Sequence, residues 1–464
     1  MSLVSRRAIL TALMGNAVAA RFAGAQTRSL SKPKPLASDA VTHDWTAFLG
    51  PTHNAISTET RLSRTPQPPL IWEFTKGTGY ASPAIAGDRL VFLHRLGREE
   101  IVECLQAETG APRWQFRYAT DFEDRYGYNN GPRSSPVIDA ARAYTVGAQG
   151  QLHCLDLGTG KLIWKHDLDK EYRVPQDFFG RGSTPLIEGS LLIVSVGAPG
   201  GPCVVGFDKT TGREVWRAGM EWGAGYASPV PAVVHGQRRV FVFAGGESKP
   251  PIGGLMSIDP SNGRVDFAFP WRSRAFESVN AACPVVFDNK VFISASYRAG
   301  GALVEILPDF THRQVWTTQE FGLHFNTPIY KDGHLYGFDG RNEPDASLAC
   351  VNASTGKVVW RKAPEWAEVI AVPGQQRQRQ LVGTYRGSLL AVDGQFLCLG
   401  ELGHLLWMDL TPKGYKEVSR GWLFAARESW TLPVLSRGLL YVAQNTRDIV
   451  TGAPPRLLCY DLRA

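Results

Sequence analysis

The chain lacks the short motifs that mark several enzyme classes. Its 464 residues contain no G-x-S-x-G and no P-loop, which excludes the usual hydrolase and nucleoside-triphosphatase signatures. Two cysteines are never adjacent, and neither C-x-x-C nor zinc-type His/Cys spacing occurs. A D-x-D-x-D calcium loop is also missing. The sequence therefore identifies no catalytic residue, and whether the protein is an enzyme stays open.

Charge and long apolar runs are scarce as well. Only 20% of the residues are charged and 44% are hydrophobic, a balance that excludes disorder over most of the chain. No apolar run of helical pattern is long enough to span a membrane. The net charge of +7 is mild and dispersed, so we expect no nucleic-acid partner.

What the chain does contain is a repeated phrase with a period of about 50 residues. Clear copies run over Cys104–Trp114, Cys154–Trp164, Gly206–Trp216 and Cys350–Trp360, and weaker copies over 257–267, 305–316 and 407–418. Alternating apolar residues before a T-G turn predict strand, turn, strand. The eighth copy begins at Cys459 and stops at the C-terminus, and its missing outer strand is supplied by the segment around Trp72.

A second phrase precedes each copy and predicts the two inner strands. In seven of eight cases a proline marks the start of the innermost strand, and Leu389 is the exception. We therefore predict an all-β fold, an eight-bladed β-propeller of four-stranded antiparallel blades, closed by an N-terminal strand that completes the C-terminal blade. Six outer-strand tryptophans are expected to dock structurally on the neighbouring blade, each removing ~150–250 Å² from water: Trp72, Trp114, Trp164, Trp216, Trp316 and Trp360.

Four of the seven cysteines occupy one equivalent strand position in four different blades. Equivalent positions in separate blades lie far apart, so Cys104, Cys154, Cys350 and Cys459 are interpreted as small buried apolar residues. We expect no disulfide framework.

The N-terminus has the pattern of an export signal. Arg6 and Arg7 precede a moderately apolar stretch, and small residues stand before Gln26, which predicts a twin-arginine-type signal peptide over 1–25. A Sec signal and a basic disordered tail are the alternatives. Residues 26–43 are predicted to be a flexible leader and 44–464 the propeller. The expected location is periplasmic or secreted.

The phrase from Asp156 to Trp164 resembles the tryptophan-docking repeat of the pyrroloquinoline quinone (PQQ)-like β-propeller family. That family includes PQQ-dependent alcohol dehydrogenases and BamB, the propeller subunit of the outer-membrane barrel-assembly machinery. The opening Trp45–Ser57 and the motifs GPRSSP, GYASP and LLCYDL resemble secreted bacterial repeat proteins of this family. The resemblance covers roughly residues 44–464, and its repeats specify the fold rather than an activity.

The resemblance implies what an enzyme of this family would need. The quinoprotein dehydrogenases hold PQQ on the propeller axis with a Trp floor, a vicinal Cys–Cys disulfide, Ca²⁺ on carboxylate and Asn oxygens, a base Asp and an Arg. This chain has no adjacent cysteines and is shorter than those enzymes. PQQ and calcium are therefore kept as an alternative, with no catalytic residue transferred.

Side chains just before each innermost strand should converge on the channel rim and are the candidate ligand-binding residues: Tyr80, Arg133, Arg181, Tyr226, Asn280, His324, Arg386 and Trp430. Arginines and aromatics together suit an anionic or planar ligand. The alternative is that these residues cap loops or pair with nearby carboxylates. Glu277, Asn280 and Glu428 are weak metal candidates, and surface salt bridging is the other interpretation of the two glutamates.

Two loops rich in Tyr, Phe and Arg, 121–133 and 167–182, predict a protein or carbohydrate surface on one propeller face. We expect an exported monomer that acts as a binding or scaffold module for a protein or small ligand. The alternatives are a PQQ- and calcium-dependent alcohol dehydrogenase and a BamB-like outer-membrane assembly partner.

Overall fold

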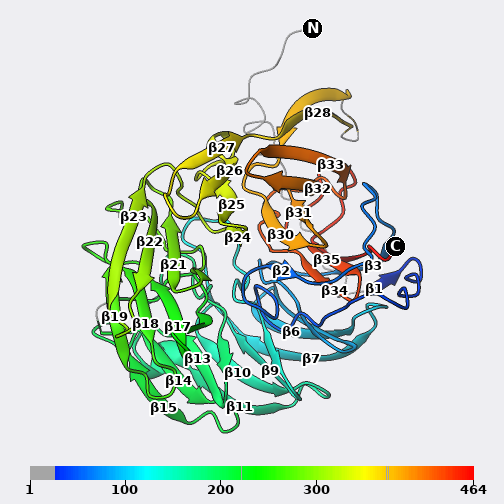
Figure 1. Ribbon diagram of the computed structural model, residues 1–464. Helices are drawn as coiled ribbons and strands as arrows, with labels where there is room; N and C mark the ends of the chain where they lie inside the picture. Colours follow the sequence, from blue (N-terminus) through cyan, green and yellow to red (C-terminus); the bar gives the residue numbers. More distant parts are fainter. Residues whose placement is uncertain (1–26, 221, 372–373, 375) are drawn as a thin grey trace.

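The computed structural model describes residues 27–464 except 221, 372, 373 and 375. The predicted signal peptide therefore lies outside the described residues. Eight antiparallel sheets of four strands surround a central axis as the blades of a propeller (Figure 1). The all-β, eight-bladed prediction is confirmed, and the described chain has almost no helix.

The blades follow the chain, and in each the first strand is the innermost. The bounds for the first four blades are β4 (Ala84–Ala86), β5 (Arg89–Leu96), β6 (Glu99–Gln106), β7 (Pro112–Ala119); β8 (Val137–Asp139), β9 (Arg142–Val146), β10 (Gln151–Asp156), β11 (Leu162–Asp167); β12 (Leu186–Glu188), β13 (Leu191–Ser195), β14 (Val204–Asp208), β15 (Glu214–Ala218); β16 (Val230–Val234), β17 (Gln237–Ala244), β18 (Gly254–Ile258), β19 (Val265–Pro270).

The remaining blades complete the ring. Their bounds are β20 (Val285–Phe287), β21 (Lys290–Ala295), β22 (Gly300–Ile306), β23 (His312–Thr318); β24 (Ile329–Lys331), β25 (His334–Asp339), β26 (Ser347–Asn352), β27 (Val358–Lys362); β30 (Ser388–Val392), β31 (Gln395–Leu399), β32 (His404–Thr411), β33 (Gly414–Trp422); β34 (Val434–Ser436), β35 (Leu439–Gln444), β36 (Arg456–Asp461) and, from the N-terminus, β3 (Leu70–Thr75).

Ring closure occurs at the predicted strand. β3 pairs antiparallel with β36, and Trp72 lies opposite Cys459, as Trp114 lies opposite Cys104 within blade 1. β3 therefore supplies the outer strand that the last repeat lacks. Blade 8 is complete because both ends of the chain contribute strands to one sheet. All seven cysteines are free and buried in this structure, which agrees with the interpretation of Cys104, Cys154, Cys350 and Cys459 as small buried residues.

The docking tryptophans carry the contact between blades. The Trp114 indole nitrogen donates to the Leu157 carbonyl at 2.9 Å, and the ring packs under the turn at Gly160, which has a φ of +72°. Corresponding bonds to the next blade are made by the indole nitrogens of Trp72, Trp164, Trp216, Trp316 and Trp360. A repeated turn glycine thus leaves room for the aromatic ring of the preceding blade.

Blade 7 departs from the repeat in two ways. Trp407 stands on β32 opposite Ser419 on β33, so the large side chain has moved to the third strand of the blade. Before this blade, β28 (Glu365–Ile370) and β29 (Gln378–Gly383) form an extra hairpin that projects from the ring (Figure 1). The repeat pattern did not predict that hairpin.

The N-terminal segment contacts blade 8. Strand β1 (Thr27–Ser29) pairs with β3, and the Lys34 amide donates to the Asp461 carboxylate at 2.7 Å. The described part of the leader is therefore hydrogen-bonded to blade 8 at these positions. Two short helices, α2 (Leu168–Glu171) and η1 (Glu343–Asp345), lie in loops. No helix among the described residues is long and apolar enough to cross a membrane.

Candidate functional site

Residues 45–57, which we call the plug, run across one end of the propeller axis. Trp45 exchanges two main-chain bonds with Ile85 of blade 1, at 2.9 and 2.7 Å, and the Thr46 carbonyl accepts from Ile138 of blade 2. At the far end of the plug, β2 (Ile56–Ser57) pairs in parallel with β30 of blade 7. The plug therefore connects blades 1 and 2, on one side of the closing blade 8, with blade 7 on its other side.

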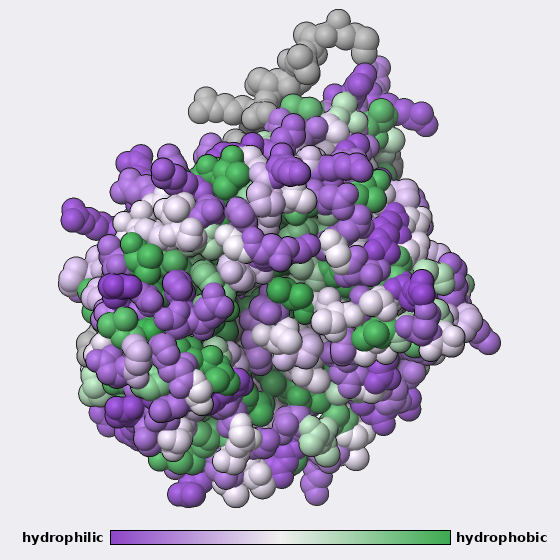
Figure 2. All heavy atoms as spheres, in the orientation of Figure 1, coloured by the Kyte–Doolittle hydropathy of each residue, from purple (hydrophilic) through white to green (hydrophobic). Residues whose placement is uncertain are grey.

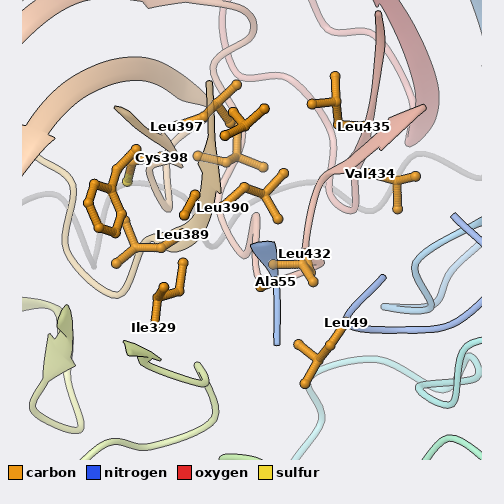
Figure 3. Close-up of a cluster of buried hydrophobic side chains, with 14 of the residues drawn as sticks. Leu49, Ala55, Ile329, Leu389, Leu390, Leu397, Cys398, Leu432, Val434 and Leu435 are labelled. Atoms are coloured by element: carbon orange, nitrogen blue, oxygen red, sulfur yellow. The ribbon is translucent and has the colours of Figure 1, made fainter. Parts of the chain in front are cut away.

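Apolar side chains of the plug pack on the innermost strands. Leu49 and Ala55 are 4% and 1% exposed and lie beside Leu389, Leu432 and Ile329 (Figure 3). Burial of these groups is favourable by ~25 cal/mol per Å² of apolar surface. The channel end facing the plug is thus closed by an apolar floor.

Above this floor lies a cavity of about 280 Å³, which we call the axial pocket. Its size suits a small ligand. The polar and aromatic residues that line it include Tyr80, Tyr126, Tyr128, Arg133, Phe179, Tyr226, Glu277, Tyr297, His324, Phe325, Asn326, Arg341, Asn342, Arg386 and Trp430. Figure 2 shows the hollowed centre of this view, where hydrophobic and hydrophilic side chains meet.

The structure brings together most of the residues that the sequence placed at the rim. Six of the eight line the axial pocket: Tyr80, Arg133, Tyr226, His324, Arg386 and Trp430. Arg181 instead lines a neighbouring hollow of about 540 Å³, the side pocket, which shares Gly182 and Tyr226 with the axial pocket. Asn280 lines neither, because its buried amide donates to the carbonyls of Ala244 and Trp271 at 2.7 and 3.0 Å.

The three arginines named from the sequence are paired with carboxylates. Arg133 bonds the buried Asp124, Arg181 bonds Asp169 at 2.9 Å, and Arg386 bonds Glu401 at 3.1 Å as well as Glu343. This pairing is the alternative that the sequence left open. The positive charge of these side chains is largely neutralised inside the protein, so they act first as fixed hydrogen-bond donors and ring partners.

Aromatic rings form a continuous arc around the pocket. Centroid distances are 5.7 Å for Phe179–Tyr226, 6.1 Å for Tyr128–Phe179 and 5.6 Å for Tyr128–Trp430. From Trp430 the arc continues to Tyr80 at 5.3 Å. Tyr126 and Tyr128 are 48% and 52% exposed at the mouth. Tilted rings at these distances are favourable and leave planar faces available to a ligand.

The two glutamates predicted as weak metal candidates have different surroundings. Glu428 accepts from the Tyr80 hydroxyl, and burial raises the pKa of its carboxyl. Glu277 lines the axial pocket and is exposed. Within the described residues, no group of three or more His, Cys, Asp or Glu side chains is arranged to hold a metal ion.

The residues present do not fit the calcium–quinone site of the dehydrogenases. Every cysteine is single and buried within a blade, so no vicinal disulfide forms a roof. Asp124, Glu401 and Glu428 are committed to Arg133, Arg386 and Tyr80, which leaves too few oxygens for calcium, an ion that takes ~6–8.

Sequence reasoning missed two residues on neighbouring blades. Tyr297 follows β21 and Arg341 follows β25, and both reach the axial pocket from the loop after the second strand of the blade. Both residues occupy the same loop of their blades, blades 5 and 6. An alignment of these loops in the sequence could therefore have identified them. Tyr126, Tyr128 and Phe179 come from the two long loops that the sequence did single out.

The fold is that of a PQQ-like eight-bladed β-propeller. A family model described as outer membrane protein assembly factor BamB matches residues 98–362, and the chain belongs to that family.

Among curated proteins, the quinoprotein alcohol dehydrogenase PedH of Pseudomonas putida is 26% identical over 240 residues, which cover 51% of this chain and 36% of that protein. The chain thus matches about a third of that enzyme's length.

Solved structures show the same fold. A europium-containing methanol dehydrogenase aligns with a TM-score of 0.63 at 12% identity, covering 90% of this chain and 98% of that chain. A quinohemoprotein alcohol dehydrogenase from Comamonas testosteroni gives 0.60 at 11%, covering 91% and 81%. BamB from Moraxella catarrhalis gives 0.53 at 17%, covering 85% and 97%. At these identities the likeness concerns the fold alone.

Proposed function

We propose that this protein is an exported PQQ-like β-propeller that binds a small ligand in its axial pocket and acts as a binding module. The observation that carries the proposal is a pocket with an apolar floor, an arc of aromatic rings and fixed arginine donors. Export is supported by the twin-arginine pair at Arg6 and Arg7 and by the family's description as an outer membrane assembly factor.

Binding is tested by calorimetry of the purified protein against small ring compounds, with Tyr128→Ala as the first variant. Tyr128 is exposed and belongs to the arc of aromatic rings around the pocket. Removal of its ring should therefore weaken binding without unfolding the protein. Tyr330→Ala is the matched control, because Tyr330 stacks on Phe287 and does not line the pocket. Equal affinity of both variants and the unaltered protein would contradict binding in the axial pocket.

The first alternative is a PQQ- and calcium-dependent alcohol dehydrogenase, favoured by the similarity to PedH. Incubation with PQQ and Ca²⁺, followed by dye reduction with several alcohols, distinguishes the two functions. We expect no turnover, because Asp124, Glu401 and Glu428 already hold arginine and tyrosine and Glu277 is the one carboxylate among the described residues that line the pocket. Turnover that Arg133→Ala abolishes would establish the enzyme.

The second alternative is an outer-membrane assembly partner, favoured by the family model and by the projecting β28–β29 hairpin. Val369 and Leu381 on this hairpin are 58% and 51% exposed. Specific capture of an outer-membrane β-barrel assembly protein, lost with Val369→Asp and Leu381→Asp together, would support this function. Capture that is unchanged by those substitutions would contradict a role for the hairpin.

A further inference from the structure

The axial pocket contains one arginine that differs from the others. Arg341 is exposed, and among the described residues no carboxylate lies within ion-pair distance of its guanidinium, whereas Arg133 and Arg386 are paired and largely buried. An arginine that is not paired with a carboxylate of the protein is well suited to the carboxylate of a ligand, which it can bind through two parallel bonds. The pocket therefore offers one unneutralised position for a single negative group.

Two further groups are fixed beside Arg341. Its guanidinium lies 4.2 Å from the centroid of the Tyr297 ring, and the Tyr297 hydroxyl is 3.3 Å from Nε2 of His324. Burial, with Arg386 and Arg341 nearby, lowers the pKa of His324 to about 3, so the imidazole is neutral. Burial also raises the pKa of Tyr297, which keeps the phenol protonated as a donor.

The backbone at Tyr297 is strained in a way that positions this side chain. Tyr297 and Arg298 have φ values of 60° and 64°, a left-handed conformation that non-glycine residues rarely adopt. The Ser273 hydroxyl holds the loop by donating to the Tyr297 carbonyl at 2.6 Å. Such strain persists where surrounding contacts impose it, and it is common at binding sites.

The rest of the pocket offers acceptors as well as donors. Glu277 is exposed at the mouth. Burial and the charge of Glu277 raise the pKa of Tyr126, whereas the charge of Arg341 lowers it. Asn326 donates through Nδ2 to the carbonyls of Arg386 and Gly387 at 2.8 Å each, which leaves its own carbonyl oxygen as an acceptor. A negative carboxylate and amide oxygen are poor neighbours for a ligand with several negative groups, but they accept well from hydroxyls.

We propose that the axial pocket binds a uronic-acid unit, whose carboxylate pairs with Arg341 beside Tyr297, whose hydroxyls donate to Glu277 and Asn326, and whose ring stacks on Trp430 and Tyr128. This inference rests on the proposed function and names its ligand class. Aromatic faces suit the apolar C–H face of a pyranose as they suit planar rings. One carboxylate per unit matches the one unpaired arginine.

The experiment is isothermal titration of the full mature protein with D-galacturonate and its trimer, compared with galactose and galacturonate methyl ester. We expect the acid to bind at least tenfold more tightly than the neutral sugar and the ester. Arg341→Gln should weaken uronate binding by about tenfold or more, the range of a charge-assisted bidentate pair. Arg341→Lys should retain part of the affinity, because it keeps the charge and loses the planar fork.

Arg298→Gln is the matched control. It removes the same charge from an exposed arginine one residue from Tyr297 that does not line the pocket, and it should bind uronate like the unaltered protein. Thermal unfolding of all variants confirms folding.

Four results would overturn the proposal: no uronate binding, equal binding of acid and ester, no effect of Arg341→Gln, or an equal effect of Arg298→Gln. Binding of benzoate or PQQ in place of uronate would leave the proposed binding function standing and refute the ligand class. If no ring compound binds, the proposed function fails too.

Discussion

The contact between a docking tryptophan and the next turn glycine gives a quantitative prediction. In Gly160→Ala the new Cβ would lie 2.5 Å from Cε3 of Trp114, inside van der Waals contact, and the alanine would keep a φ of +72°. The backbone strain alone costs ~1–2 kcal/mol. To relieve the clash Trp114 must shift, which weakens its 2.9 Å bond to Leu157 and exposes part of its ring.

The sum of these effects follows from ordinary magnitudes. Loss of a buried hydrogen bond costs ~1–2 kcal/mol. Re-exposing about 50 Å² of the ring adds ~1 kcal/mol. We therefore expect Gly160→Ala to reduce the free energy of unfolding by about 3–5 kcal/mol, measured by urea denaturation followed by circular dichroism.

Gly87→Ala is the matched control for this measurement. Gly87 also has a positive φ, of +58°, but a Cβ there would meet no atom within 4 Å. It should cost only the ~1–2 kcal/mol of strain. If the two variants lose the same stability, the steric account of the glycine–tryptophan dock is wrong.

Three further predictions concern the titration of His153, the reactivity of the cysteine thiols and the ion pair between Asp124 and Arg133. Burial lowers the pKa of His153 to about 4, against about 6.5 in the unfolded chain, so its contribution of ~3 kcal/mol is complete above pH 6.5 and is lost as the pH falls toward 4. His153→Phe should reduce the slope of the stability–pH curve in this window without removing it, because His53, His324 and His404 also have lowered pKa values; an unchanged slope would contradict the prediction. With all seven thiols free and buried, dithiothreitol should leave Tm unchanged and a thiol reagent should label seven cysteines only after unfolding; a drop in Tm would reveal a disulfide. Asp124→Asn should destabilise the protein by ~3–5 kcal/mol in denaturation, because Arg133 would lose its buried partner, and a loss below about 1 kcal/mol would refute that role.

Much of the fold could be predicted because its information is local and repeated. Alternation before a turn, a glycine in the turn and an aromatic residue after it specify one blade, and eight copies specify a ring. The truncated copy at Cys459 and the strand at Trp72 even located the closure, which the pairing of β3 with β36 confirms.

The departures from the repeat were harder to predict. Trp407 and Ser419 exchange the usual large and small positions, and the β28–β29 hairpin follows no repeated pattern. The described leader was expected to be flexible, yet its polar residues bond to blade 8 through backbone groups that composition does not describe. Local patterns cannot show which distant strand edge will accept such a segment.

The sequence by itself determined the blade and the number of blades, because each copy of the repeat is specified by residues close together in the chain. It also identified the closing strand, because the copy truncated after Cys459 lacks the outer strand that the segment around Trp72 supplies. Only the tertiary structure decided which rim residues face one cavity and that three arginines are neutralised by carboxylates. It also decided that Arg341 stacks on Tyr297, near His324, with no carboxylate among the described residues paired to it. These facts depend on distances between loops of different blades, which the period of a repeat does not fix. The plug under the axial pocket belongs with them, since residues 45–57 acquire their role only when the ring has closed around them.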